Sequence, residues 1–319
     1  MKRNSDGFAQ IWLVFIGFMI LTVAGTTVAF LNRDTSSAAM ISELAYTPTD
    51  ESAEDGLSAD RVNGTRLKQF VKTLLSQPVD TTELDSQIAT ILNNNSDIYI
   101  SVAIKDLRSG SVHNYGKQEA MTAASVTKVL TAVDFMKEVE LGHKSLEMIL
   151  ANGYSAQENI EQMIVYSDNN AWHTLNNSLT YSQMQSYAES IGLLSYNYVD
   201  NSISAADITR LLADTYQRKL INESNTQLLL SYMERANFRD LIVPAVPEFD
   251  TVYHKAGWLE SHLNDATIIT NGNHAIVLTI FTDSITSYDK ARISAVMQQI
   301  TTPTLATFRL DQPPITVPQ

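Results

Sequence analysis

The spacing of apolar residues changes twice along this chain, and the order of those changes restricts its fold more than any other feature. Apolar and polar residues alternate over 99–107, which is typical of a strand, and a turn leads into a second strand that ends near residue 115. Between about residues 125 and 240, apolar residues instead recur at helical spacing. The pattern therefore predicts a strand pair followed by a helical middle.

Strand patterns return after the helical middle. They cover 252–259, 266–270 and 275–281, and Asn271-Gly272 between the last two is a strong hairpin signal. Helical spacing over 291–300 predicts a closing helix. Strands at both ends of one domain predict an α+β fold, in which a single antiparallel sheet is built from both ends of the domain, with helices on its faces and a helical subdomain.

Composition excludes several classes of protein. The 319 residues include 22 Lys and Arg against 35 Asp and Glu, and the formal net charge of −13 argues against binding to nucleic-acid phosphate. Hydrophobic residues make up 44% of the chain and charged residues 18%, as expected for a folded protein. Because there is no cysteine, covalent chemistry must come from Ser, Thr or Lys, and disulfides and thiolate metal clusters are excluded.

An uncharged apolar segment covers residues 8–32 and is long enough to span a bilayer as a helix. Lys2 and Arg3 precede it, so the positive-inside rule places residues 1–7 in the cytoplasm and the rest of the chain outside. We therefore expect a single-pass membrane protein with an extracytoplasmic C-terminal domain. A cleaved signal peptide, with small residues at 35–39, is the alternative, and it exports the body as well.

The remaining chain divides by composition and periodicity. Residues 33–64 are rich in Ser, Thr, Ala and acidic side chains, which predicts a flexible acidic stalk. Helical spacing predicts a lead-in helix at 65–81 and then the main domain at 82–302. Residues 303–319 form a predicted C-terminal tail.

One short motif places a hydroxyl and an amine close together. Ser125-Val126-Thr127-Lys128 opens a predicted helix, so its first and last side chains share one face. Serine needs a nearby base to act as a nucleophile, and a lysine can be that base where burial or another cation lowers its pKa. The same spacing from Ser287 to Lys290 shows that the pattern alone is weak, and a helix-capping serine beside an exposed lysine remains the alternative.

Two further motifs follow in order. Ser167-Asp168-Asn169 lies in the helical middle, and Lys255-Ala256-Gly257 lies on a predicted strand. Together with the first motif they give S-x-x-K, S-D-N and K-x-G, the set found in class A β-lactamases and penicillin-binding proteins. The chain resembles this family of serine acyl-transferases over roughly residues 82–302. The resemblance implies a β-lactamase/transpeptidase-like fold.

The resemblance also implies a role for each motif residue. Ser125 would be the nucleophile, and Lys128 its general base or proton relay. Ser167 would pass a proton to the leaving nitrogen, while Asn169 would hydrogen-bond to Lys128 or to the substrate amide. Lys255 would attract a substrate carboxylate and help to keep Lys128 neutral.

The strand motif implies the remaining substrate contacts. Gly257 would allow close approach of the strand to the substrate backbone. The amide of Trp258, together with that of the nucleophile, would form an oxyanion hole. Trp258 could also line the cleft with its indole.

The sequence departs from the family pattern in two places. We find no Glu-x-x-Leu-Asn loop, whose glutamate activates the deacylating water in class A β-lactamases. Asp200 could replace that glutamate, although a turn or capping carboxylate is the more usual role for such a residue. Ala256 stands where the family usually carries a hydroxyl that binds the substrate carboxylate. Acylation is therefore better supported than fast hydrolysis.

These observations predict a membrane-anchored, extracytoplasmic serine hydrolase that forms an acyl-enzyme with a cell-wall peptide or β-lactam-type amide and deacylates slowly. The alternatives are a true β-lactamase with an unrecognised base and a catalytically silent wall-binding module. No cofactor is expected, and the six histidines contain no His-x-x-x-His pair that would suggest zinc. The expected partners are the small-molecule or peptide amide and the membrane, with no nucleic acid.

Overall fold

The computed structural model describes residues 79–272, 274–285 and 288–312. The predicted membrane segment at 8–32 and the stalk at 33–64 lie outside these residues, and so does most of the predicted lead-in helix. Its last part, residues 79–81, is not helical, because the Asp80 carboxylate turns toward the amide of Thr82 at the start of the next helix. No helix among the described residues is long and apolar enough to cross a membrane.

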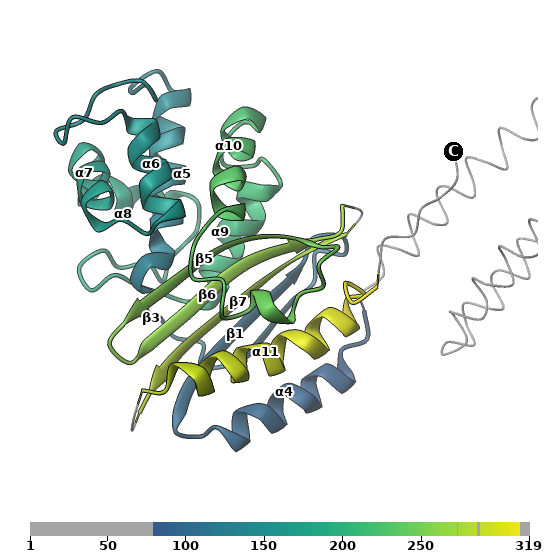
Figure 1. The fold of residues 1–319 in the computed structure, drawn as a ribbon. Helices are drawn as coiled ribbons and strands as arrows, with labels where there is room; N and C mark the ends of the chain where they lie inside the picture. Colours follow the sequence, from purple (N-terminus) through teal and green to yellow (C-terminus); the bar gives the residue numbers. More distant parts are fainter. Residues whose placement is uncertain (1–78, 273, 286–287, 313–319) are drawn as a thin grey trace, which may run out of the picture. The chain divides into compact units, whose positions relative to one another are not determined.

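Five antiparallel strands form the main sheet, in the order β2-β1-β7-β6-β5 (Figure 1). The first two strands precede the helical middle and the last three follow it, so the sheet is built from both ends of the domain as predicted. The central pairing joins the early strand β1 to the late strand β7 along nine residue pairs. The strands are β1 (Ile98–Asp106), β2 (Val112–Gly116), β5 (Thr251–Leu259), β6 (His262–Thr270) and β7 (Ala275–Ser284).

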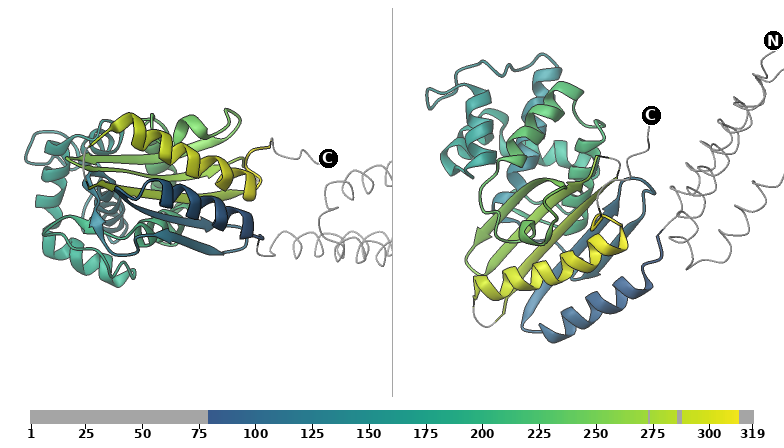
Figure 2. Two further views of the ribbon diagram at one scale, coloured as in Figure 1. Left: turned by 90° about the horizontal axis from the view of Figure 1, so that it is seen from below. Right: turned by 45° about the vertical axis from the view of Figure 1, so that its right-hand side comes forward.

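Helices cover both faces of the sheet. On one face α4 (Thr82–Asn94) and α11 (Lys290–Thr307) lie side by side (Figure 2). The other face carries the helical subdomain, in which α9 packs directly on β1, β6 and β7. The subdomain helices are α5 (Lys128–Glu140), α6 (Ala156–Val165), α7 (Asn169–Leu179), α8 (Tyr181–Ser190), α9 (Ala205–Tyr216) and α10 (Glu223–Glu234). This arrangement confirms the predicted α+β fold.

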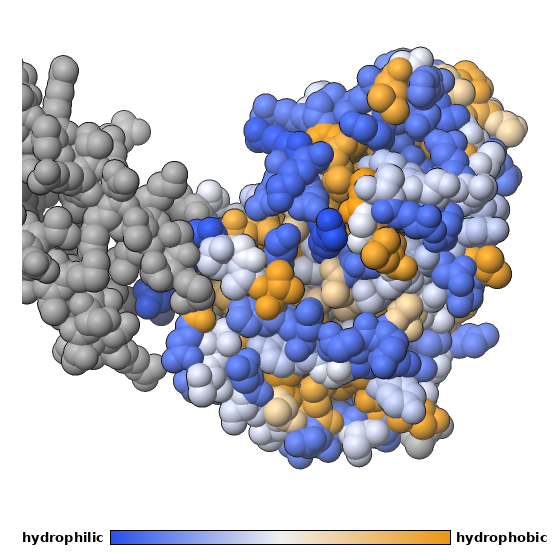
Figure 3. All heavy atoms as spheres, turned by 180° about the vertical axis from the view of Figure 1, so that it is seen from behind, coloured by the Kyte–Doolittle hydropathy of each residue, from blue (hydrophilic) through white to orange (hydrophobic). Residues whose placement is uncertain are grey.

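Each face of the sheet has its own apolar core. One core joins the sheet to the helical subdomain, and the other lies between the sheet and the pair α4 and α11. On the surface shown in Figure 3, apolar side chains occur in small patches separated by polar ones. The apolar surface is thus buried mainly between layers, as expected for two layers of helices packed on one sheet.

The closing helix is longer than predicted. Helix α11 continues to Thr307, so the predicted domain end at residue 302 was placed too early. Pro303, which cannot donate a backbone hydrogen bond, lies inside the helix. The helix nevertheless continues because Leu305 and the following Phe308 are buried in the core beneath it.

A two-stranded sheet was missed by the pattern analysis. It pairs β3 (Met121–Thr122) with β4 (Ser202–Ile203), beside the short 3₁₀ helix η1 (Ala124–Thr127). Strands of two residues are too short to show an alternating pattern. Their pairing ties the segment before Ser125 to the start of α9. A second 3₁₀ helix, η2 (Val243–Ala245), follows α10.

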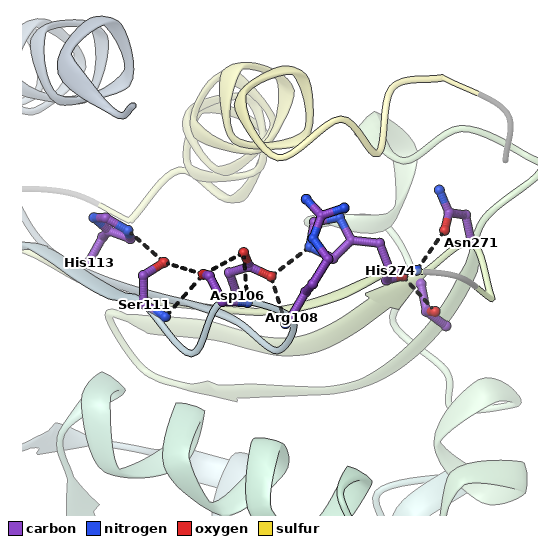
Figure 4. A network of polar contacts seen from close by, with 8 residues as sticks. Asp106, Arg108, Ser111, His113, Asn271 and His274 are labelled. Atoms are coloured by element: carbon purple, nitrogen blue, oxygen red, sulfur yellow. Dashed lines mark hydrogen bonds and ion pairs between the residues drawn. The ribbon is translucent and has the colours of Figure 1, made fainter. Parts of the chain in front are cut away.

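A buried carboxylate fastens two turns at the far end of the sheet (Figure 4). The side chain of Asp106 accepts hydrogen bonds from the amide of Arg108 and the hydroxyl of Ser109, and it pairs with His274 Nε2 at 2.6 Å. Burial alone would raise the pKa of Asp106, but these partners hold the pKa below its usual range. The pair joins the turn after β1 to the hairpin between β6 and β7.

Another buried carboxyl group generates a stability prediction. Asp134 on α5 is 1% exposed, and neither of its oxygens has a partner among the described residues. Burial, followed by the charge of Glu138, raises the pKa of Asp134 to about 7 against the opposing charge of Lys144. In the unfolded chain the pKa is about 3.9, so the folded state binds the extra proton between these values. The free energy of unfolding is therefore expected to fall as the pH rises from about 4 to about 7.

Asp134→Asn should remove this fall and raise the free energy of unfolding at pH 8 by on the order of 2–4 kcal/mol. Denaturant unfolding of both proteins at pH 5 and pH 8 measures the effect. Glu189→Gln, which changes an exposed carboxylate on α8, is the matched control and should behave like the wild type. An equal dependence on pH in wild type and Asp134→Asn would contradict the prediction.

Candidate active site

Ser125 lies in the 3₁₀ turn η1, immediately before α5 begins at Lys128. The preceding residue, Ala124, has a φ of +51°, a conformation that L residues with a Cβ seldom adopt. Such backbone strain persists only where the surroundings hold it, and it is common at functional sites. The Ser125 side chain is partly exposed, so a ligand can reach its hydroxyl.

Strand β5 packs directly against this turn at Gly257. A Cβ at residue 257 would lie 2.6 Å from the carbonyl oxygen of Ala123 and 2.8 Å from the amide nitrogen of Ser125. Both atoms belong to the backbone and cannot rotate away. The side chain of Asn264, opposite Gly257 on β6, donates to the carbonyl of Thr122 at 2.8 Å and holds the same segment on the sheet. The glycine therefore permits contact between β5 and the Ser125 turn.

Lys128 is fully buried at the start of α5. Its Nζ donates to the backbone carbonyl of Ser167 at 2.6 Å and to Asn169 Oδ1 at 2.7 Å, with Ser167 Oγ at 3.4 Å. No hydrogen bond joins Lys128 to the hydroxyl of Ser125 within the described part of the chain. The S-x-x-K spacing thus brings the two residues to adjacent turns, while the second motif holds the amine.

Lys255 on strand β5 contacts Ser167 from the side of the sheet. Its Nζ donates to Ser167 Oγ at 3.0 Å and to the carbonyl of Ala256 at 3.2 Å, and its side chain is 1% exposed. The hydroxyl of Ser167 therefore lies between the two amines. Ser167 has a φ of +60°, and the Asp168 carboxylate caps the next helix by accepting from the amide of Ala171. This tight turn at the start of α7 presents the hydroxyl to both lysines.

Burial shifts the pKa of both amines downward. Desolvation lowers the pKa of Lys128 to about 8, although the Asp168 carboxylate opposes the shift. Desolvation and then the charge of Lys128 lower the pKa of Lys255 to about 7, against the opposing charge of Asp265. Neither amine forms an ion pair with a carboxylate among the described residues. Near neutral pH the two amines together therefore carry fewer than two positive charges.

Trp172 is a further contact of Lys128 that the motifs do not include. Its ring centre lies 5.4 Å from Lys128 Nζ, and its Nε1 donates to Thr131 at 2.9 Å. Trp172 also packs against the core of the helical subdomain. Its position one turn after Asn169 on α7 was the available signal, because residues three apart share a helix face.

Three other residues from the sequence analysis do not face the amines. The indole of Trp258 is 62% exposed, stacks on Tyr288 and donates to the carbonyl of Glu260, so only its backbone adjoins Gly257. Ala256 is buried in the core on the α11 side of the sheet. Asp200 accepts from both the amide and the hydroxyl of Ser202, which is the turn role rather than that of a base near Ser125.

The loop after α10 connects the two walls of the site. The amide of Asn237 donates to the carbonyl of Val165, and its side chain donates to the carbonyl of Tyr166, next to Ser167. On the sheet side, the buried pair of His254 and Asp265 holds the same loop. His254 Nε2 lies 3.2 Å from the carbonyl of residue 236, and Asp265 Oδ2 accepts from the amide of residue 242. The helical wall and the lysine-bearing strand are thus cross-linked.

The sequence over residues 83–308 matches the profile of the beta-lactamase enzyme family. The chain belongs to this family. It is accordingly a serine hydrolase related to class A β-lactamases and penicillin-binding proteins, which confirms the resemblance carried by the three motifs. A comparison with curated proteins gave no significant match.

Solved structures share this fold at low sequence identity. PBP-A is 22% identical, with a TM-score of 0.67, covering 73% of this chain and 98% of its own. A variant of the class A beta-lactamase of the last common ancestor of Gram-negative bacteria is 19% identical, with a TM-score of 0.66, covering 72% of this chain and 100% of its own. At these identities the likeness establishes the fold alone.

No group of three or more His, Asp or Glu side chains suited to a metal ion occurs in the described residues of this family member. Two of the buried histidines form pairs with carboxylates, His254 with Asp265 and His274 with Asp106. The polar groups that converge on the Ser167 hydroxyl are instead the two amines, and Lys128 also binds the side-chain oxygen of Asn169.

The contact at Gly257 can be tested by substitution. Gly257→Ala is expected to destabilise the domain by about 1–3 kcal/mol, because the added carbon meets backbone atoms. It should also speed hydrogen exchange over residues 123–126. Gly142→Ala is the matched control, since Gly142 has a φ of +76° with open space around it, so its replacement strains the backbone away from the site. Unchanged stability and exchange in Gly257→Ala would contradict the close approach.

The lysine pKa values can be measured by NMR titration of the side-chain carbons. We expect two lysine signals to titrate between about pH 7 and pH 8. In Lys128→Met the pKa of Lys255 should rise, because the repelling charge of Lys128 is gone. Lys219→Met, which removes a surface lysine paired with Asp214, should leave both signals in place. Titration of every lysine near pH 10 would show that the amines are solvated.

Proposed function

We propose that this chain acylates Ser125 with an amide substrate, either a cell-wall peptide or a β-lactam, and releases the acyl group slowly. The observation that carries the proposal is the convergence of two buried amines, Lys128 and Lys255, on the Ser167 hydroxyl beside the Ser125 turn. An inert scaffold would gain nothing from burying two amines without carboxylate partners, because desolvating them costs free energy.

In the acylation step, Ser125 Oγ attacks the carbonyl carbon while its proton passes to the neutral amine of Lys128, directly or through a water molecule. The carbonyl oxygen gains the electron pair and is stabilised by the backbone amides of Ser125 and Trp258. The contact of Gly257 with the Ser125 amide supports this pairing, because it brings the next residue of β5 to the same place.

In the second half of acylation, the C–N bond breaks and the leaving nitrogen takes a proton from Ser167 Oγ. Lys128 and Lys255 both lie within reach of that oxygen, so the proton that Lys128 removed from Ser125 can replace the one that Ser167 gave up. Protons and charge then balance across the step, and the acyl group remains on Ser125 as an ester.

A carboxylate on the substrate would favour the neutral form of Lys128, which is the form that can act as a base. In the free enzyme burial lowers the pKa of both amines, and the charge of Lys128 further lowers the pKa of Lys255. An anion beside Lys255 would favour its protonated form, and the new charge would then disfavour protonation of Lys128. Binding of an acidic substrate, such as a peptide C-terminus, would therefore shift the proton to Lys255 and leave Lys128 as a neutral base.

Slow deacylation follows from the missing carboxylate. Fast hydrolysis of the ester needs a positioned base for water. Asp200 is occupied by Ser202, and no carboxylate hydrogen-bonds to Ser125 or Lys128 in the described chain. Among structures with this fold, a PBP-A variant is an acyl-enzyme complex with penicillin G, at 22% identity and a TM-score of 0.67 over 73% of this chain and 99% of its own. That complex supports β-lactams as probes.

We further propose that the domain acts outside the cytoplasm on a membrane tether. The support is the uncharged segment at 8–32, the basic residues before it and the acidic stalk at 33–64. A tether would hold the enzyme near the cell wall, where peptides with free C-terminal carboxylates are the expected amides.

Mass spectrometry of the domain after incubation with penicillin G tests acylation. We expect an adduct on Ser125 in the wild type and none in Ser125→Ala. Ser287→Ala, at the second S-x-x-K spacing, should leave the adduct unchanged. A chromogenic cephalosporin then separates the alternatives. One turnover or a few per enzyme supports slow deacylation, whereas rapid multiple turnover identifies a true β-lactamase. No adduct with any lactam or D-Ala-D-Ala ester would favour the silent wall-binding module.

A further inference from the structure

Asn201 lies in the loop between α8 and α9 and forms hydrogen bonds with the turn that carries Ser125. Its Nδ2 donates to the carbonyl of Ala124 at 2.8 Å, and its Oδ1 accepts from Thr127 Oγ1 at 2.6 Å. Its backbone carbonyl accepts from the amide of Ala123 at 3.0 Å. These partners lie just before and just after Ser125 in the chain.

The three contacts close a ring around the strained part of the turn. Thr127 Oγ1 also lies 3.2 Å from the carbonyl of Ala124, so Asn201, Thr127 and Ala124 contact one another. Asn201 itself has a φ of +52°, and asparagine tolerates this region better than most residues. Two left-handed residues from distant parts of the chain are therefore joined by the asparagine side chain.

The loop that carries Asn201 is itself held in place. Residues 197 and 202 exchange backbone hydrogen bonds, and Asp200 binds Ser202. Farther back, Ser195 Oγ donates to Asp207 on α9 at 2.6 Å. Asn201 is thus presented from a braced loop, as positioning a second residue to within a fraction of an ångström requires.

We infer that Asn201 is a positioning residue that fixes the backbone of Ser125, and with it the direction of the hydroxyl and of the oxyanion-hole amide. The inference rests on the proposed acylation of Ser125. The loop between α8 and α9 would thereby support the acylation half of the reaction.

Asn201→Gly is the sharpest test, because glycine keeps the left-handed backbone while removing both side-chain hydrogen bonds. The rate constant for acylation by a chromogenic cephalosporin at saturation should fall roughly 10- to 100-fold, since small misplacements of reacting atoms have effects of this size. The concentration for half-saturation should change less than about threefold. Val199→Gly, which removes an exposed side chain from the same loop, should acylate like the wild type.

A second variant covers the case in which Asn201→Gly fails to fold. Thr127→Val removes one contact of the ring and should slow acylation, whereas Thr127→Ser keeps the hydroxyl and should restore the rate. Wild-type acylation rates in Asn201→Gly and Thr127→Val would overturn the inference. So would a loss in Thr127→Val that Thr127→Ser does not restore.

Hydrogen exchange separates this inference from the proposed function. If no lactam acylates the wild type, the proposed function fails, and exchange of the amides over 123–127 still tests the ring of contacts. Faster exchange there in Asn201→Gly, with no change in Val199→Gly, supports the positioning role. Equal exchange in both variants overturns it.

Discussion

Two buried lysine amines that meet at one serine hydroxyl are the constraint on which the rest of the site depends. Removing an ammonium group from water is costly unless it finds partners or loses its proton. Here Lys128 is supported by the Ser167 carbonyl, the Asn169 amide and the ring of Trp172, while Lys255 has the Ser167 hydroxyl and one carbonyl. Because no carboxylate among the described residues forms an ion pair with either amine, burial keeps the pKa of both amines low. The same burial that destabilises the ammonium form therefore creates the base.

Such a pair is useful only if the two walls of the site keep a constant separation. Lys128 belongs to the helical subdomain and Lys255 to the edge strand of the sheet. The two residues are 127 positions apart in the sequence. The contact of Gly257 with the Ser125 turn fixes the walls on one side. The loop held by His254 and Asp265 fixes them on the other, through its bonds to the end of α6. Rigid cross-links on both sides explain how a cleft between two layers can hold hydrogen bonds of about 3 Å.

Much of the fold and the motif residues could be predicted from sequence, because both depend on local patterns. Alternating and helical spacing located the strands and helices, and the three motifs named the residues around Ser167. The contacts of Asn201 and the cross-link at His254 could not be predicted, since they join residues far apart in the chain and leave no periodic signal. The end of α11 was misplaced because the helix continues past Pro303 where Leu305 is buried, and that burial depends on the whole domain. The lowering of both lysine pKa values likewise depends on burial, which the spacing of residues in the sequence does not report.

The pairing of β1 with β7 determines when the site can form during synthesis of the chain. These central strands are separated by the whole helical subdomain, so the sheet has a high contact order and closes only after the last strands exist. A chain that is still being synthesised contains the serine and its neighbouring lysine well before it contains the second amine on β5. Reactivity should therefore appear only on completion of the polypeptide. Until then a nascent chain lacks the complete pair of amines.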